Sequence, residues 1–239
     1  MIFPLRDENP TARVPFVTYT IIALNVFAWV FLQSFGMDPG LSESICRFGL
    51  VPGDLLGNIS PGAELRISET LLCRFDGTSN PITLVTSMFM HGGWMHIIGN
   101  MWFLWVFGDN VEDIMGSVRF AIFYLLSGLV AAMAQISTDV GSIVPMVGAS
   151  GAIGGVMGAY ALVYPRARVQ TLVFLGFFLT TGAVPAVFIV GWWGVLQLLA
   201  GLPALGASGG GVAFWAHVGG FLAGLLLVTL FRRDKRMDF

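Results

Sequence analysis

The sequence contains little charge. Only 11% of its 239 residues are Asp, Glu, Lys or Arg, against roughly 25% in ordinary soluble domains. The net charge is −2, and no basic stripe with interleaved aromatic residues occurs, so we expect no nucleic acid as a partner. Apolar residues fill the chain instead, at 56% of the total. This composition predicts a membrane protein with the lipid bilayer as its surroundings.

Cysteine is also scarce. Cys46 and Cys73 are the only two, and both fall in the longest polar segment, away from every histidine. We therefore expect no zinc site, no other metal and no organic cofactor. Two free thiols are the expected state of this pair. The alternative is a disulfide, which would form if the segment faces an oxidising compartment.

Long apolar runs are the main feature that is present. They lie at residues 17–35, 86–108, 118–137, 147–164, 183–201 and 213–231. Because a bilayer core of about 30 Å requires roughly 20 apolar residues in a helix, the sequence predicts an all-α, six-transmembrane-helix bundle. The apolar residues 171–182, which precede Pro185, are assigned to an interfacial lead-in to the fifth helix.

The runs divide the chain into three parts. Residues 1–16 are a cytoplasmic N-terminal segment with acids and prolines, unlike a cleaved signal peptide. Residues 17–231 are the membrane domain, with a long outer loop at 36–85 between helices 1 and 2. Residues 232–239 are a basic cytoplasmic tail.

The positive charges set the predicted orientation. With both termini in the cytoplasm, nine of the twelve Lys and Arg residues face the cytoplasm and the other three lie in the long outer loop. We expect a multi-pass protein of a bacterial inner (plasma) membrane. The nine are Arg6, Arg13, Arg119, Arg166, Arg168, Arg232, Arg233, Lys235 and Arg236.

Polar residues gather at one predicted depth. The second, fourth and sixth spans run in the same direction, and each carries polar side chains one or two turns below its outer end. These are His91, His96 and Asn100, then Ser150, then His217. Ionisable groups inside spans are costly and usually face a bundle interior or a water-filled cavity, which makes this layer the candidate site.

Glycines can bring two of these helices close together. Gly154 and Gly158 follow Ser150 at intervals of four, and Gly220 and Gly224 share a face with His217. Small residues at this spacing let helix backbones approach closely. If the two faces pack together, the Ser150 hydroxyl and the His217 imidazole come within hydrogen-bond distance.

This pairing predicts nucleophilic catalysis. Ser150 would be the nucleophile and His217 its general base. No Asp or Glu lies in either span, so we expect a dyad and do not expect Asp139, in an outer loop, to complete a triad.

Further residues fit supporting roles in the same layer. His96, Asn100 and the backbone N–H of Ser150 would form the oxyanion hole. Gly148 and Gly151 would leave room for a substrate backbone. His91 is assigned a structural or auxiliary role.

Other functions compete with this one. A serine beside glycines is usually a packing residue, and a lone intramembrane histidine can relay protons. A transporter or proton channel is disfavoured because the polar layer lies near one face only and no acid lies in the middle of the membrane. A non-catalytic module that binds membrane proteins remains the main alternative.

The motifs resemble the rhomboid family of intramembrane serine proteases over nearly the whole chain. HGGWMHIIGN resembles the family's His-x-x-x-Asn element, GASG its nucleophile motif, and AHVGGFLAG its sixth-span histidine. The resemblance implies a Ser150–His217 dyad that cuts single-span membrane proteins at or near the membrane boundary, after a small residue. It also implies a lateral gate at residues 183–201 and a cap over the site at 202–212.

Two positions depart from the family pattern. The first outer loop lacks the Trp-Arg pair of many members. Gly154 stands where some relatives place an aromatic residue that stacks on the catalytic imidazole, so His217 must be oriented by something else.

Overall fold

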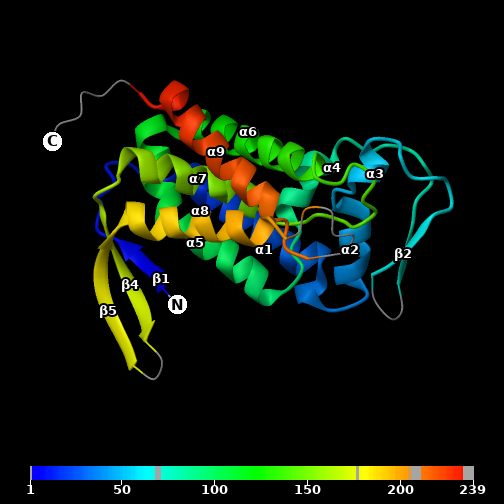
Figure 1. The fold of residues 1–239 in the computed structure, drawn as a ribbon, viewed down its shortest axis with the longest axis horizontal. Coiled ribbons are helices and arrows are strands. Elements are labelled where there is room, and N and C mark those ends of the chain that lie inside the picture. The colour runs from blue at the N-terminus through cyan, green and yellow to red at the C-terminus, as the bar shows by residue number, and fades with distance from the viewer. Residues whose placement is uncertain (1, 68–70, 176–177, 204, 206–210, 234–239) are drawn as a thin grey trace.

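A computed structural model describes residues 2–67, 71–175, 178–203, 205 and 211–233, which form mainly helices lying side by side (Figure 1). Four predicted features fall partly outside these residues. They are the long loop at 36–85, the interfacial lead-in at 171–182, the cap at 202–212 and the basic tail at 232–239, including Lys235 and Arg236.

The long helices follow the predicted apolar runs closely. They are α1 (Phe16–Phe27) with a π-helical turn at Ala28–Leu32, α5 (Trp94–Met115), α6 (Ser117–Ile136), α7 (Ser150–Val163), α8 (Ala186–Gly201) and α9 (Phe214–Phe231). The largest difference is in the second run, where residues 86–93 precede the helix and α5 continues to Met115.

A three-stranded antiparallel sheet contradicts the all-α prediction. It has the order β1-β4-β5, formed by Ile2–Asp7, Arg168–Leu175 and Phe178–Pro185. The described part of the predicted interfacial lead-in at 171–182 therefore belongs to a β-hairpin. An apolar run of this length fits a strand or a helix equally well on hydropathy, and its pairing partner β1 lies at the far N-terminus.

The sheet is anchored to the central helix α7. The Tyr160 hydroxyl donates a hydrogen bond of 2.6 Å to the Asp7 carboxylate at the end of β1. Burial raises the pKa of Asp7, and this hydrogen bond acts in the opposite direction.

The described residues between 34 and 89 contain short elements. These are a 3₁₀ turn at Ser34–Gly36, α2 (Gly40–Phe48), α3 (Pro52–Leu55), β2 (Glu64–Arg66), β3 (Leu72–Arg74), α4 (Thr83–Thr86) and a 3₁₀ turn at Ser87–Phe89. Cys46 of α2 and Cys73 of β3 form a disulfide, with their Cα atoms 5.5 Å apart. The expectation of two free thiols was wrong, because sequence distance does not show that the fold brings α2 and β3 together.

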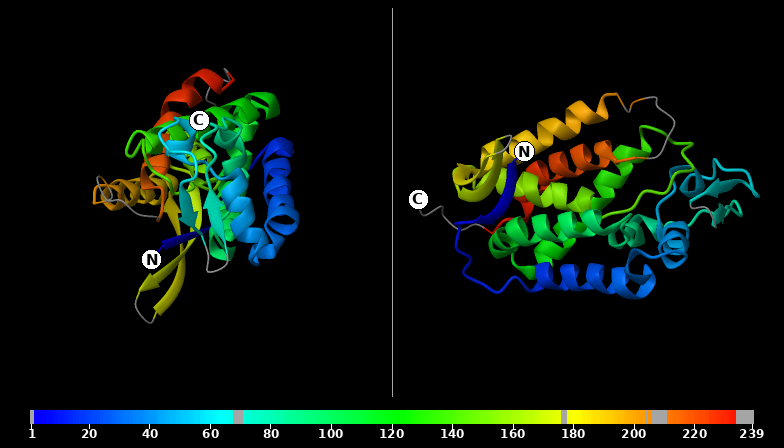
Figure 2. Two further views of the ribbon diagram at one scale, coloured as in Figure 1. Left: turned by 90° about the vertical axis from the view of Figure 1, so that its right-hand side faces the viewer. Right: turned by 90° about the horizontal axis from the view of Figure 1, so that it is seen from below.

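The two ends of the bundle differ. The sheet and the C-terminal end of α9 lie at one end, whereas residues 36–85 lie at the other (Figure 2). Arg233 near the end of α9 donates a hydrogen bond to Met115 O at the end of α5. Helices α5 and α9 therefore run in the same direction, and the contact of Ser150 with His217 at the starts of α7 and α9 adds α7, as the sequence predicts for spans 2, 4 and 6.

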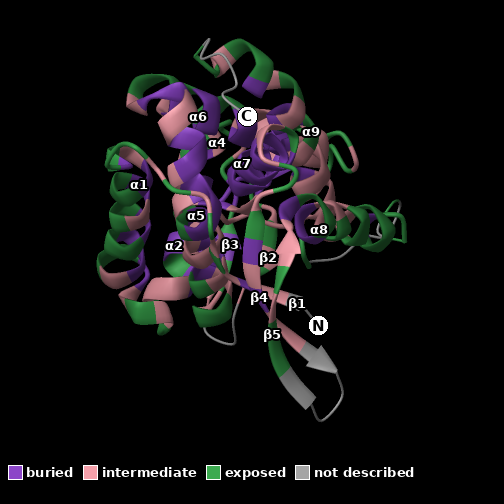
Figure 3. Ribbon diagram, turned by 90° about the vertical axis from the view of Figure 1, so that its left-hand side faces the viewer, coloured by how far each residue is buried: buried purple, intermediate pink, exposed green. Residues whose placement is uncertain are grey.

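Helix α7 forms the centre of the molecule. Its residues 151–161 are all buried, mainly between α5, α6 and α9 (Figure 3). The outer helices expose apolar side chains instead, including Leu222, Leu226 and Leu230 along α9. Apolar surface on this scale is unusual for a soluble monomer.

The lengths and compositions of the helices are consistent with a membrane. Helices α6 and α9 are each long and apolar enough to cross a bilayer. Three further apolar helices are shorter: Phe16–Leu32, α7 and α8.

Candidate active site

Ser150 and His217 are in direct contact. The Ser150 Oγ lies 2.7 Å from His217 Nε2. Ser150 is the first residue of α7, and His217 lies in the first turn of α9. Since these helices start at the same end of the bundle, two residues 67 positions apart meet at one depth.

Glycine lets α7 and α9 approach each other. A Cβ on Gly220 or Gly224 would overlap the carbonyl groups of Gly151 and Gly155, so the backbones are in contact at both positions. Gly154 and Gly158 lie instead against the backbone of residues 217–221. The helices approach each other along the predicted glycine faces. The partners of Gly220 and Gly224 are, however, Gly151 and Gly155, one residue along from the predicted face of Gly154 and Gly158.

The first turn of α9 is held by a side chain of α6. Gln135 Oε1 accepts hydrogen bonds from the backbone N–H groups of Trp215 and Ala216, at 3.1 and 3.2 Å. These groups have no partner within the helix. Gln135 thus acts as a cap from a neighbouring helix and holds the segment that carries His217.

The second ring nitrogen of His217 contacts α8. His217 Nδ1 lies 2.8 Å from Gln197 Oε1. The Trp193 ring, one turn earlier on α8, lies 5.7 Å from the imidazole between centroids. The aromatic neighbour missing at Gly154 is therefore supplied by α8.

Sequence reasoning missed Gln197 and Trp193 because it searched for acids as the partner of His217. Asp139 instead accepts a hydrogen bond from Gly141 N in its own loop. A signal was present, since Gln197 is the one amide or charged side chain in the run 183–201.

His96 directs a donor toward Ser150. The Gly92 N–H donates a hydrogen bond of 3.2 Å to His96 Nδ1, so the proton of a neutral ring is on Nε2. That Nε2 lies beside Gly148, where a Cβ would be 2.7 Å from Nε2 and 3.6 Å from Ser150 Oγ. Gly148 also has φ +124°, which disfavours any other residue.

The remaining predicted residues differ in their placement. Asn100 donates one amide N–H to His96 O at 2.9 Å and has a second N–H. His91 is buried and precedes α5, with its ring 5.1 Å from that of His96. A Cβ on Gly151 would lie 2.6 Å from Ala131 Cβ, so this glycine also serves contact with α6.

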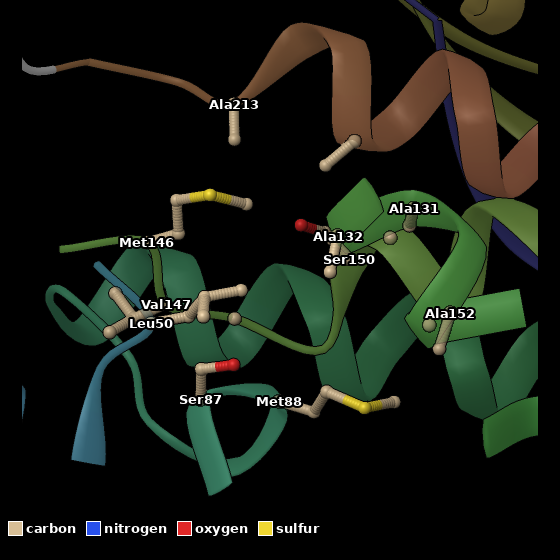
Figure 4. Close-up of a pocket in the computed structure, with 14 residues that line it drawn as sticks. Leu50, Ser87, Met88, Ala131, Ala132, Met146, Val147, Ser150, Ala152 and Ala213 are labelled. Carbon is tan, nitrogen blue, oxygen red and sulfur yellow. The ribbon is translucent and has the colours of Figure 1, made fainter. Parts of the chain in front are cut away.

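Two hollows meet at Ser150. A cavity of about 1070 Å³ is bordered by His96, Asn100, Ser150, Trp193 and His217. A pocket of about 40 Å³ also borders Ser150, and Figure 4 shows the Ser150 hydroxyl directed into it. The described residues contain no group of three or more His, Cys, Asp or Glu side chains that could hold a metal ion.

A hydrogen-bonded serine and histidine within a bundle of apolar helices define the class: a helical membrane protein with a partly buried serine–histidine pair. The chain belongs to the rhomboid family, because its residues 78–234 match the model of the Rhomboid domain.

Curated relatives agree with this assignment. Rhomboid protein 1, mitochondrial, of Saccharomyces cerevisiae is 26% identical over 67% of this chain and 44% of its own length. The human Presenilin-associated rhomboid-like protein, mitochondrial, is 30% identical over 64% of the chain and 40% of its own. RHOMBOID-like protein 5 of Arabidopsis thaliana is 32% identical over 60% of this chain and 42% of its own length. The matched region thus spans less than half of each of these relatives.

Proposed function

We propose that the chain is an intramembrane serine endopeptidase that cuts single-span membrane proteins at or near the membrane boundary. The observation that carries this proposal is the 2.7 Å contact between Ser150 Oγ and His217 Nε2. A serine hydroxyl alone is a poor nucleophile, and an imidazole at this distance can remove its proton during attack.

The proposed reaction has two stages. Ser150 Oγ attacks the peptide carbonyl carbon while its proton passes to His217 Nε2. His217 then protonates the amide nitrogen as the C–N bond breaks, which leaves an ester on Ser150. Water attacks this ester with His217 as base, releases the carboxylic acid and restores the serine.

Negative charge develops on the carbonyl oxygen during both stages. His96 Nε2–H faces the space beside Ser150, the second amide N–H of Asn100 borders the same cavity, and Ser150 N–H begins α7. Three donors around one point would stabilise an oxyanion.

The small pocket favours a small residue before the cut. Its lining includes Gly128, Ala131, Ala132, Gly148 and Ala213. A cavity for one water needs about 10–15 Å³ on the same measure. At about 40 Å³ the pocket has room for about three waters on that measure, so it accommodates a side chain of a few heavy atoms and excludes that of phenylalanine.

Six crossings with both termini in the cytoplasm give the proposed arrangement in the membrane. Arg6, Arg119, Arg166, Arg168 and Arg232 belong to the sheet, to turns or to helix ends at the end of the bundle opposite residues 36–85. This asymmetry supports the orientation. The bacterial inner membrane stays a prediction, since the yeast and human relatives are named as mitochondrial proteins.

Cleavage of a model transmembrane substrate in proteoliposomes tests the proposal. We expect the wild-type chain to cut the substrate and to react with a fluorophosphonate at Ser150. Ser150→Ala and His217→Ala should each reduce cleavage by about 10³-fold or more, because the remaining groups cannot activate the nucleophile.

A substitution on the lipid-facing side of α9, Leu226→Ala, is the matched control and should retain activity. A wild-type chain that binds transmembrane helices but neither cuts them nor reacts at Ser150 would overturn the proposal and favour a non-catalytic binding module.

A further inference from the structure

Helix α8 places one amide side chain among apolar neighbours. Its sequence AVFIVGWWGVLQLLAG contains Gln197 as the one amide or charged residue. Leu196, Leu198 and Leu199 around it are exposed on the outer surface, whereas Gln197 is partly buried and lies 2.8 Å from His217 Nδ1. A polar side chain in an apolar helix usually faces the protein interior for a functional reason.

We infer that Gln197 is a positioning residue for His217: it holds the imidazole in the tautomer that can accept the proton of Ser150. The inference rests on the proposed function, because it assigns a role relative to the same serine.

The hydrogen-bond chemistry of the three side chains allows one arrangement. For the Ser150 hydroxyl to donate to Nε2, that nitrogen must carry no proton, so the proton of a neutral ring is on Nδ1. Nδ1–H then needs an acceptor, and Gln197 Oε1 is in place. If the Gln197 amide were rotated by 180°, its –NH₂ group would face His217 Nδ1–H. Neither of these two donors would then have an acceptor.

An amide differs from the carboxylate of a serine-protease triad. Its oxygen fixes the tautomer and the ring orientation, which is the main role of the triad's acid. Being neutral, it contributes less to stabilising the imidazolium and avoids the large cost of a buried charge in an apolar surrounding. A glutamine therefore suits a site inside the membrane.

Trp193 restrains the same ring from the same helix. Residues 193 and 197 are four positions apart and thus share one face of α8. The Trp193 ring is tilted 38° from the imidazole. A Cβ on Gly154 would lie 3.5 Å from this indole, so the missing side chain at Gly154 leaves space for the tryptophan.

Three variants in the full chain test the inference. Gln197→Leu removes the acceptor at similar size, Gln197→Glu restores an oxygen at the same reach, and Leu199→Ala is a control on the exposed face of α8. We would measure kcat and KM for a model transmembrane substrate, the rate of fluorophosphonate labelling, and the ¹⁵N shifts of His217, which report the protonated nitrogen.

We expect Gln197→Leu to lower kcat by roughly 10- to 100-fold, within the contribution of a general base, with little change in KM. Labelling should slow in parallel, and the His217 proton should distribute over both nitrogens. Gln197→Glu should recover most of the activity and the Nδ1–H signal, while Leu199→Ala should match the wild type.

Two results would overturn the inference: an unchanged kcat in Gln197→Leu, or a wild-type His217 protonated on Nε2. Equal inactivity of the wild type and Ser150→Ala would instead defeat the proposed function. The ¹⁵N shifts would still decide the role of Gln197, because they require no turnover.

Discussion

Three polar side chains near Ser150 come from separate helices. His96 lies on α5, His217 on α9 and Gln197 on α8. His96 and His217 border the cavity at Ser150, and Gln197 contacts His217. No two of the three side chains share a helix. A substitution at one of them can therefore alter the chemistry while the backbone of the other helices stays in place.

The oxyanion role proposed for His96 makes a specific prediction. Replacing it by alanine should lower kcat by about 10²- to 10³-fold with a small change in KM, because the Nε2–H bond matters most when negative charge develops. The control is Ile98→Ala, which alters an exposed side chain of the same helix. Equal loss of kcat in both variants would argue for a structural effect.

At the residue scale, the sequence was most informative where the type of residue and its spacing along the chain pointed to the same group. His217 and His96 stand out because the chain has only three histidines, and Ser150 stands out because it lies at their predicted depth beside regularly spaced glycines. Gln197 was overlooked because its partner depends on how α8 packs on α9, and no spacing along the chain reveals that contact.

At the scale of helices, the contact of α7 with α9 depends on glycine at defined positions. Gly220→Ala should lower the thermal unfolding midpoint, since its methyl would overlap the Gly151 carbonyl and overpacking of this kind costs about 1–3 kcal/mol. Activity should fall as well, because the helices would separate at the level of His217.

Gly191→Ala provides the matched control. A Cβ at Gly191 meets nothing within 4 Å, and alanine in a helix interior is favoured over glycine by roughly 0.5–1 kcal/mol. We expect its midpoint to be unchanged or slightly raised. Similar destabilisation in both variants would show that the backbone contact of α7 and α9 is not what makes Gly220 sensitive.

Helix positions were predictable, but strand positions were not. Runs of about 20 apolar residues locate α6 and α9 to within one residue, because hydropathy and length act together. Residues 171–182 have the hydropathy of a helix yet pair as strands with β1, a contact between opposite parts of the chain. Pairing of this kind leaves no periodic signal at either segment alone.

At the scale of the whole molecule, the end that carries the site also carries the disulfide. Cys46 and Cys73 lie in the segment 36–85, and the isolated bridge between Leu50 and Met146 joins that segment to the approach to Ser150. Disulfides persist in oxidising compartments. The crosslink therefore supports placing this end on the outer side of the membrane.

Thiol labelling in intact cells tests this orientation. We expect both cysteines to resist a maleimide reagent until a reductant is added, and then both to react with a membrane-impermeant form. The control is a chain with both cysteines replaced by serine, which should not react. Immediate labelling without reductant would contradict the crosslink, and labelling only after the membrane is opened would contradict the orientation.

Strand β1 has a consequence for the order in which the molecule is assembled. Ile2 pairs with Val173, so β1 leaves the ribosome well before its partner β4 has been made. During that interval its backbone groups are available to other strands. A chaperone that shields β1 during synthesis would therefore serve this chain more than one that acts after release.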